Sequence, residues 1–192
     1  MLRVKKGYRD NPYHDWTHAF AVFHFAYLLV KNLDLTTVFD DLTCYSFLIA
    51  ALCHDLDHRG TNSAFEISSQ SPLASLYSSK GSVMERHHFA QTVTLLGIDG
   101  CNVFKGTSTE NNQKALDIIQ EVILATDLSQ HLRIIKDLNQ LGDKIEKGLD
   151  LKSEIKNNDQ VRHLIISILM TSSDLSDQTK NWETTKNTAV SY

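Results

Sequence analysis

The chain has 192 residues, of which 42% are hydrophobic and 22% charged, and its formal net charge is −4. This composition excludes a disordered or fibrous chain, and the acidic balance argues against a broad basic surface for nucleic acid or anionic membranes. Only 2 prolines and 8 glycines interrupt the sequence, which favours long helices over many short strands.

Apolar residues recur at helical spacing from the amino-terminal part onward. The first predicted helix, over residues 13–33, has a buried face formed by Trp16, Phe20, Phe23, Tyr27 and Val30. A second helix is predicted over residues 40–56, with Asp40 or Asp41 as its N-cap. A short helix is expected over residues 62–69.

The second half of the chain is also predicted to be helical, and no strand pair is indicated. Ser82 and Glu85 form the pattern of a capping box, which predicts a helix over residues 82–96 that Gly97 ends. The remaining predicted elements are a polar loop over 100–112, helices over 113–126 and 128–141, a solvated surface connection over 142–158, a buried helix over 160–174 and a further helix opening at Thr179.

Cysteine content and hydropathy bear on the compartment. The three cysteines include no CxxC pair, so a disulfide framework is not expected and a reducing, cytoplasmic environment is. No apolar run approaches the roughly 18 residues of a membrane-spanning helix, and no secretory signal is visible. We therefore expect a soluble cytoplasmic protein without a transmembrane segment.

Histidine is abundant, with nine residues, and most of them are grouped with carboxylates. Histidines four residues apart share one face of a helix. Imidazole nitrogen and carboxylate oxygen are ligands of zinc, and a carboxylate can bridge to a second, harder ion such as magnesium. His24, His131 and His163 are interpreted as ordinary surface or core residues. The four groups are His14 with His18, His54 with Asp55, Asp57 and His58, Glu85 with His87 and His88, and Asp174 with Asp177.

This combination of ligand types indicates a catalytic metal site rather than a structural one. Two divalent ions about 3.5–4 Å apart can support an in-line displacement at phosphorus. The groups contain histidine and carboxylate but no thiolate, whereas closed structural zinc sites are rich in cysteine. The residues by themselves therefore predict metal-assisted hydrolysis, without naming a substrate.

The segments that carry these groups resemble the class I 3′,5′-cyclic-nucleotide phosphodiesterases, a family within the HD-domain superfamily of metal hydrolases. The similar segments are residues 13–19, 53–62, 85–89, 123–128 and 170–176, in the family's order. The amino-acid sequence of residues 81–90 and 174–180 is most similar to that of the cGMP-stimulated, dual-specificity type. The resemblance covers roughly residues 11–189.

The resemblance implies an all-α, multi-helix catalytic domain that hydrolyses cAMP, cGMP or both to nucleoside 5′-monophosphates in cyclic-nucleotide signalling. It implies zinc at a first site, ligated by His18, His54, Asp55 and Asp174. It also implies magnesium or manganese at a second site, to which Asp55 would bridge.

The remaining roles come from the same resemblance. A hydroxide activated by the two metals would attack phosphorus, and His14 would protonate the departing 3′ oxygen as a general acid. His58, Glu85 and Thr126 would hold waters around the second metal, and Asp127 is a candidate for the same supporting shell. The substrate is a small molecule, no nucleic-acid partner is expected, and a homodimer is expected for the parent protein.

The sequence also departs from the family pattern. Asp15 stands where the family has asparagine, and Ser63 stands where it has asparagine or glutamine. The stretch from 141 to 159 is longer than in the most similar family members and is interpreted as a surface insertion.

A further departure concerns the extent of the domain. The family grips the purine with a glutamine and a phenylalanine well beyond the last metal-ligating aspartate, and this sequence ends at Tyr192 before reaching them. We therefore expect residues 1–192 to be a partial catalytic domain, incomplete at both ends, that holds the metal-site half without the carboxy-terminal helices of the nucleotide pocket. Its activity is expected to be far below that of a complete domain.

Two alternatives stay open from the sequence. One is a non-catalytic truncated isoform or fragment that keeps the metal site but lacks the purine pocket. The other is an HD hydrolase that acts on a different phosphate ester.

Overall fold

The computed structural model describes residues 1–77, 81–183 and 185–186. The fold is all-α, as predicted, and the described residues contain no strand. The elements are α1 (Leu2–Gly7), α2 (Trp16–Asn32), η1 (Leu35–Thr37), α3 (Asp41–Cys53), α4 (Ser63–Ser68), α5 (Pro72–Leu76), α6 (Val83–Leu96), α7 (Thr109–Leu124), α8 (Leu128–Glu146), α9 (Leu151–Asn157), α10 (Asp159–Asp174) and η2 (Leu175–Thr179).

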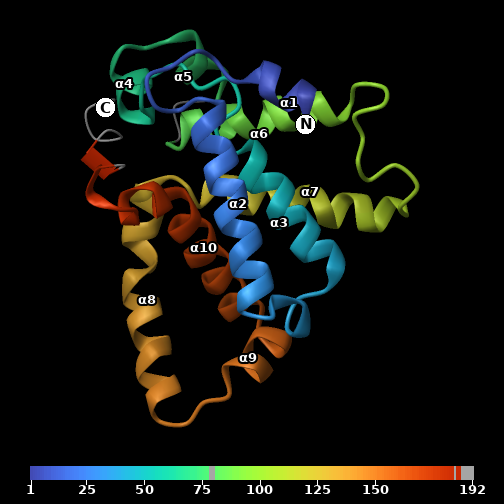
Figure 1. Cartoon of the computed structure of the whole chain (residues 1–192), viewed down its shortest axis with the longest axis vertical. Helices are drawn as coiled ribbons and strands as arrows, with labels where there is room; N and C mark the ends of the chain where they lie inside the picture. Colours follow the sequence, from blue (N-terminus) through green and yellow to red (C-terminus); the bar gives the residue numbers. More distant parts are fainter. Residues whose placement is uncertain (78–80, 184, 187–192) are drawn as a thin grey trace.

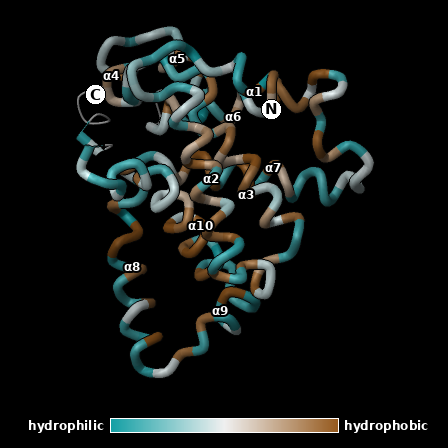
Figure 2. The backbone as a smooth tube through the Cα atoms, viewed as in Figure 1, coloured by the Kyte–Doolittle hydropathy of each residue, from teal (hydrophilic) through white to brown (hydrophobic). Residues whose placement is uncertain are grey.

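Helices α2 and α3 form the centre of the molecule (Figure 1). Helix α7 packs across α3, and α10 packs on α2, while α8 and α9 contact α10. Apolar residues concentrate along these central helices, whereas polar and apolar residues alternate along the outer helix α8 (Figure 2). The main core includes the fully buried side chains Val22, Ala50, Ile119, Ile123 and Met170.

The buried face of α2 differs from the sequence prediction. Phe20 and Tyr27 are each 45% exposed, whereas Ala19, Val22 and Ala26 are completely buried. The facing helix α3 also buries small residues, and small side chains let two helices approach closely where aromatic rings would hold them apart. The prediction was right for Trp16, Phe23 and Val30, which are partly buried and pack against the core, and wrong for Phe20 and Tyr27.

The capping box predicted for α6 is also wrong. Ser82 has a left-handed φ of 47° and makes no capping hydrogen bond; its hydroxyl instead donates to the Asp127 carboxylate. Glu85 accepts a hydrogen bond from Ser63 at 2.8 Å. Both side chains are thus taken by tertiary partners that local sequence does not reveal, although the helix does end at Gly97 as predicted.

Two predicted connections contain helix. Helix α7 begins at Thr109, capped by Ser108, inside the segment expected to be a loop. The segment 142–158, expected to be a solvated connection, contains the end of α8 and all of α9. Ile155 is buried there and packs with Leu151 on the main core. A few apolar residues among many lysines and glutamates are enough to dock this segment.

Thr179, where a further helix was expected to open, ends the 3₁₀ turn η2, and helical residues follow slightly later, at 182–183 and 185–186. Part of the sequence beyond it, namely residues 184 and 187–192, lies outside the described residues. The three cysteines are free thiols. Within the described ranges, every helix is too short or too polar to cross a bilayer.

Asp40 at the start of α3 provides a stability test. Its carboxylate accepts a hydrogen bond from the Thr43 backbone N–H at 2.7 Å and pairs with Lys114 on α7. Asp40→Ala should lower the free energy of unfolding by about 1 kcal/mol at neutral pH, the usual worth of an N-cap, as measured by urea denaturation. Asp10→Ala, at an exposed carboxylate, is the control and should change little.

This effect should depend on pH with a definite sign. Partial burial opposes ionisation of Asp40, but the Lys114 and Thr43 contacts outweigh it and lower the carboxyl pKa to about 2. Because the folded pKa lies below the ordinary value, the stabilisation is complete at neutral pH and is lost as the pH falls from about 4 toward 2. A gap between wild type and Asp40→Ala that widens below pH 4 would contradict this assignment.

Candidate active site

Four predicted site residues lie where distant helix ends meet. His18 lies in the first turn of α2, His54 is the C-cap of α3, Asp55 follows it, and Asp174 is the last residue of α10. Asp15 fixes the start of α2 by accepting hydrogen bonds from the backbone N–H groups of Thr17 at 2.8 Å and His18 at 2.9 Å. Asp15 is therefore the N-cap of α2, a role that both aspartate and asparagine fill well.

The geometry brings these four side chains into one cage. His54 Nε2 lies 3.2 Å from Asp55 Oδ2 and 3.2 Å from Asp174 Oδ1. His18 Nε2 lies 3.1 Å from the same Asp174 oxygen and 3.6 Å from the same Asp55 oxygen. Two imidazole nitrogens thus face two carboxylate oxygens, although the residues are separated by up to 156 positions in sequence.

The two buried carboxylates of this cage need positive charge to compensate them. Burial lowers the pKa of His18, but hydrogen bonds with Asp174 and Asp177 outweigh it and raise the pKa to about 9. Burial acts on His54 in the same direction, and the charges of Asp55 and Asp174 nevertheless raise its pKa well above the ordinary value. Two protonated imidazoles therefore compensate two buried carboxylates, and one divalent cation would supply the same charge.

Unsatisfied polar atoms indicate the same site. His54 Nε2 and Asp55 Oδ2 are buried and lack a hydrogen bond with acceptable geometry, although they lie 3.2 Å apart. Such atoms are rare in folded proteins and often mark an ion. The ligand atoms of His18, His54 and Asp55 also lie within 4.8 Å of one another. The residues therefore fit a divalent metal with nitrogen and oxygen ligands, the donor set that zinc accepts.

Backbone contacts set the tautomers of the neighbouring imidazoles. A carbonyl oxygen can only accept, so His54 Nδ1, 2.9 Å from the Ala51 carbonyl, and His88 Nδ1, 2.7 Å from the Leu56 carbonyl, must each carry a proton. Nε2 is therefore the nitrogen of each residue that can bind a metal in place of a proton; it faces Asp55 and Asp174 in His54, and Asp55 in His88. His58 differs, because its Nδ1 accepts from the Gly60 N–H at 3.0 Å and its proton is on Nε2. In this tautomer the Nε2–H of His58 can donate a hydrogen bond, whereas it cannot bind a metal ion.

Asp55 also faces a second group of potential ligands. Its Oδ1 lies 3.7 Å from His88 Nε2, and Asp55, His58 and His88 form a second cluster whose atoms lie within 4.8 Å of one another. The prediction did not assign a role to His88. Its three-residue spacing from Glu85 on α6 places both on one helix face, and this signal was available in the sequence.

Glu85 points to the same region and is held by Ser63. The Ser63 hydroxyl donates to Glu85 Oε2 at 2.8 Å and accepts from the Met84 N–H at 3.0 Å. Burial is the main cause of the raised pKa of Glu85. Serine at this departure from the family pattern therefore has a defined structural role.

An open cleft of about 500 Å³ leads to the cage and is lined by His14, His58, Glu85, Thr126, Asp127 and Asp174, among others. His14 stacks on His58 with ring centroids 3.9 Å apart. Asn11, which the prediction missed, donates from one amide to the His14 carbonyl at 3.1 Å and to the His58 carbonyl at 2.8 Å. It thereby ties together the two loops that carry these imidazoles.

Thr126 and Asp127 lie at the rim of the cleft between α7 and α8. The Thr126 hydroxyl donates to the Ile123 carbonyl at 2.8 Å. Both Asp127 oxygens are engaged, one by Ser82 and the other by the Ser129 N–H at 2.9 Å as the N-cap of α8. Their expected role in holding water stays a prediction.

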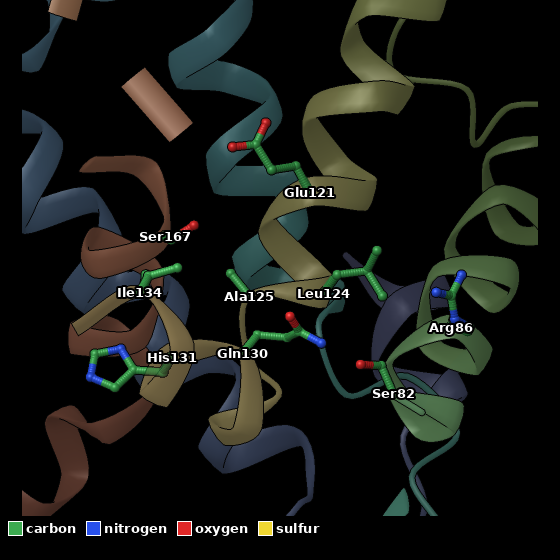
Figure 3. A pocket seen from close by; sticks show the side chains of 9 residues that line it. All are labelled: Ser82, Arg86, Glu121, Leu124, Ala125, Gln130, His131, Ile134 and Ser167. Atoms are coloured by element: carbon green, nitrogen blue, oxygen red, sulfur yellow. The ribbon is translucent and has the colours of Figure 1, made fainter. Parts of the chain in front are cut away.

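A separate pocket of about 340 Å³ lies between α6, α7, α8 and α10 and shares no lining residue with the cleft (Figure 3). Arg86 on α6 borders it together with Ser82, the residue just before α6, and His131 borders it on α8. Glu121 of this pocket pairs with His163 Nδ1 at 2.5 Å. None of the predicted metal ligands reaches it, and the histidine cage belongs to the cleft alone.

The described residues form an all-helical fold with a buried histidine–aspartate cluster, which could hold a metal ion, at the foot of an open cleft. Residues 13–192 match the 3′5′-cyclic nucleotide phosphodiesterase family, and the chain belongs to this family. It is 38% identical over 184 residues to the cGMP-specific 3′,5′-cyclic phosphodiesterases of Drosophila virilis and Drosophila melanogaster, with 95% of this chain covered in each case.

The extent of these matches is uneven. The chain spans 20% of the Drosophila virilis protein and 16% of the Drosophila melanogaster protein. The solved structure of LmjPDEB1 in complex with IBMX superposes with a TM-score of 0.86 at 31% identity, covering 99% of this chain and 55% of that one. The similarity to the cGMP-stimulated type stays a prediction.

Proposed function

We propose that this chain carries the metal centre of an enzyme that hydrolyses 3′,5′-cyclic nucleotides to nucleoside 5′-monophosphates. The observation that supports this most is that Nε2 of His18 and Nε2 of His54 each lie within 3.6 Å of a carboxylate oxygen of Asp55 and of Asp174, in a chain of this family. The chain spans a fifth or less of the Drosophila relatives, so the activity and its substrates are inferred for this protein. A cytoplasmic location is proposed with it, in keeping with the free thiols.

In this proposal His18, His54, Asp55 and Asp174 hold zinc. Asp55 offers its second oxygen toward His88, where magnesium or manganese would bind. When bound, such ions supply Lewis acidity at the phosphoryl oxygens and lower the pKa of water toward neutrality. The chain's own contribution is to hold the donors in place before the ions arrive, through helix caps and backbone hydrogen bonds.

His14 is proposed as the general acid. It lies at the cleft, stacked on His58 and outside the four-residue cage. Burial lowers its pKa in the free protein, and an anionic phosphodiester placed beside it would raise the pKa again. The imidazole would then carry a proton when substrate is bound and deliver it to the departing 3′ oxygen.

His58, Glu85, Thr126 and Asp127 are proposed to order water at the second ion. His58 presents an Nε2–H donor, because its Nδ1 accepts from Gly60. Glu85 is kept in place by Ser63. These side chains would orient water rather than hold the first ion.

The test is hydrolysis of cGMP and cAMP by the purified protein, with 5′-nucleotide product separated by chromatography. Chelation should reduce turnover about 100-fold or more, because the attacking water needs activation by a metal. Adding zinc with magnesium should restore turnover. Calcium alone, which prefers six to eight oxygen ligands, is the matched control and should not restore turnover. Hydrolysis that persists after removal of all metal would overturn the proposal, and so would the absence of hydrolysis of both nucleotides by a protein that extends this chain to a complete catalytic domain.

A further inference from the structure

The imidazole of His18 lies between two carboxylates that belong to the same turn of chain. Its Nε2 is 3.1 Å from Asp174 Oδ1, inside the cage. Its Nδ1 is 3.1 Å from Asp177 Oδ2, on the side away from the cage. An ionised carboxylate can only accept, so the Nδ1 of His18 carries the proton and donates it to Asp177.

The turn η2 explains how both carboxylates reach one ring. Asp174 ends α10, and Asp177 lies three residues later within the 3₁₀ turn. Side chains three residues apart in a 3₁₀ helix project in the same direction. Because η2 packs against α2, this common direction points at His18 in the first turn of α2.

Asp177 is itself held in place. It is only 8% exposed, although it is charged. Its second oxygen, Oδ1, accepts from the Lys180 ammonium at 2.7 Å. The carboxylate therefore has one oxygen on the imidazole and the other on a cation, which is a complete set of partners for a buried charge.

We propose that Asp177 is a positioning residue that fixes the ring orientation and the tautomer of His18, so that the Nε2 lone pair of His18 is directed at zinc. This inference rests on the proposed function, and it assigns a role to a residue that the sequence analysis named but gave none. The other histidines near the cage, His54 and His88, donate from Nδ1 to backbone carbonyls. His18 is held by a charged side chain instead.

The choice of a carboxylate has a chemical consequence. A charge-assisted hydrogen bond to Nδ1–H makes the imidazole a better electron donor at Nε2 than a neutral carbonyl does. Because one turn supplies both the ligand Asp174 and the positioning residue Asp177, unwinding of η2 would loosen two of the zinc contacts together. The metal site is thereby coupled to the winding of this single turn.

The test compares Asp177→Ala and Asp177→Asn with wild type, and uses Asp137→Asn on α8 as a control for loss of one exposed negative charge. Zinc affinity is measured by competition with a chromophoric chelator. Nuclear magnetic resonance follows the Nδ1 proton of His18, which exists with or without zinc. Circular dichroism checks the fold of each variant.

Asp177→Ala should weaken zinc binding by about 10–100-fold, the usual cost of losing such a partner, and should shift the His18 Nδ1 proton upfield and speed its exchange. Asp177→Asn keeps an acceptor oxygen and should recover most of the affinity while still moving the proton signal. Asp137→Asn should change neither quantity.

The outcomes separate the positioning role from the proposed function. If wild type binds zinc and both Asp177 variants bind it equally well with an unmoved Nδ1 proton, the positioning role is overturned. A lower melting temperature with unchanged zinc affinity also overturns it, because it shows a purely structural contact. If wild type itself binds no zinc, the metal centre of the proposed function fails instead. If Asp177→Ala does not fold, the Asp177→Asn proton shift and zinc affinity decide.

Discussion

Asp174→Ala should abolish stoichiometric zinc in the purified protein. Oxygen Oδ1 of Asp174 lies within 3.2 Å of Nε2 in both His18 and His54, so its loss removes the donor that the two imidazoles share. Losing a residue that hydrogen-bonds a metal ligand lowers metal affinity roughly 10–100-fold. Losing the ligand itself should lower zinc affinity by more than about 100-fold. Elemental analysis after gel filtration measures the zinc content directly.

The fold should survive this change. The Asp174 side chain is 21% exposed at the cleft, so alanine leaves no sealed cavity in the core. Asp159→Ala, in the first turn of the same helix α10, is the matched control and should keep full zinc content, because Asp159 lies at the opposite end of α10 from Asp174 and pairs with Arg162. One equivalent of zinc retained by Asp174→Ala would remove this residue from the proposed ligand set.

His14→Ala should lower turnover by about 10²–10⁴-fold, the range for loss of a general acid, and leave zinc content unchanged. The physical reason is that His14 borders the cleft without contributing to the four-residue cage. Turnover is measured with cyclic GMP and with a phosphodiester whose p-nitrophenolate leaves without a proton. The defect should be large for the cyclic nucleotide and small for the activated ester.

His24→Ala, which removes an exposed imidazole from α2, is the matched control and should behave as wild type. Equal losses of zinc and turnover in His14→Ala would make His14 a ligand instead of an acid. Equal defects toward both substrates would show that His14 binds the phosphate and donates no proton.

The cage could be predicted from the sequence in outline. The four groups of histidine and carboxylate were visible, as were the helices that carry them, and the family resemblance added the roles of His14, His18, His54 and Asp55. The structure places atoms of the two predicted ligands that are farthest apart in sequence, His18 and Asp174, 3.1 Å from each other. Asn11 was missed because its sequence context is ordinary, whereas His88 was grouped with Glu85 in the sequence but was given no role.

Local structure that depends on tertiary partners was predicted least well. Ser82 and Glu85 had the spacing of a capping box, but Asp127 and Ser63 take their side chains. Phe20 and Tyr27 of α2 were assigned to the core but are exposed, whereas Ala19 and Ala26 are completely buried. In both cases the arrangement that makes contacts with a distant segment is more stable than the arrangement that the local sequence pattern predicts.

The sequence by itself determined the helical fold class, the residue types of the metal cage and the family to which the chain is similar. These follow from spacing, because a 3.6-residue period fixes which side chains share a face of one helix. Only the tertiary structure showed three hydrogen bonds: between Asp177 and His18 Nδ1, between Ser63 and Glu85, and between Ser82 and Asp127. Each of these contacts joins elements far apart in the chain, and their meeting is set by how whole helices pack, which no local period encodes.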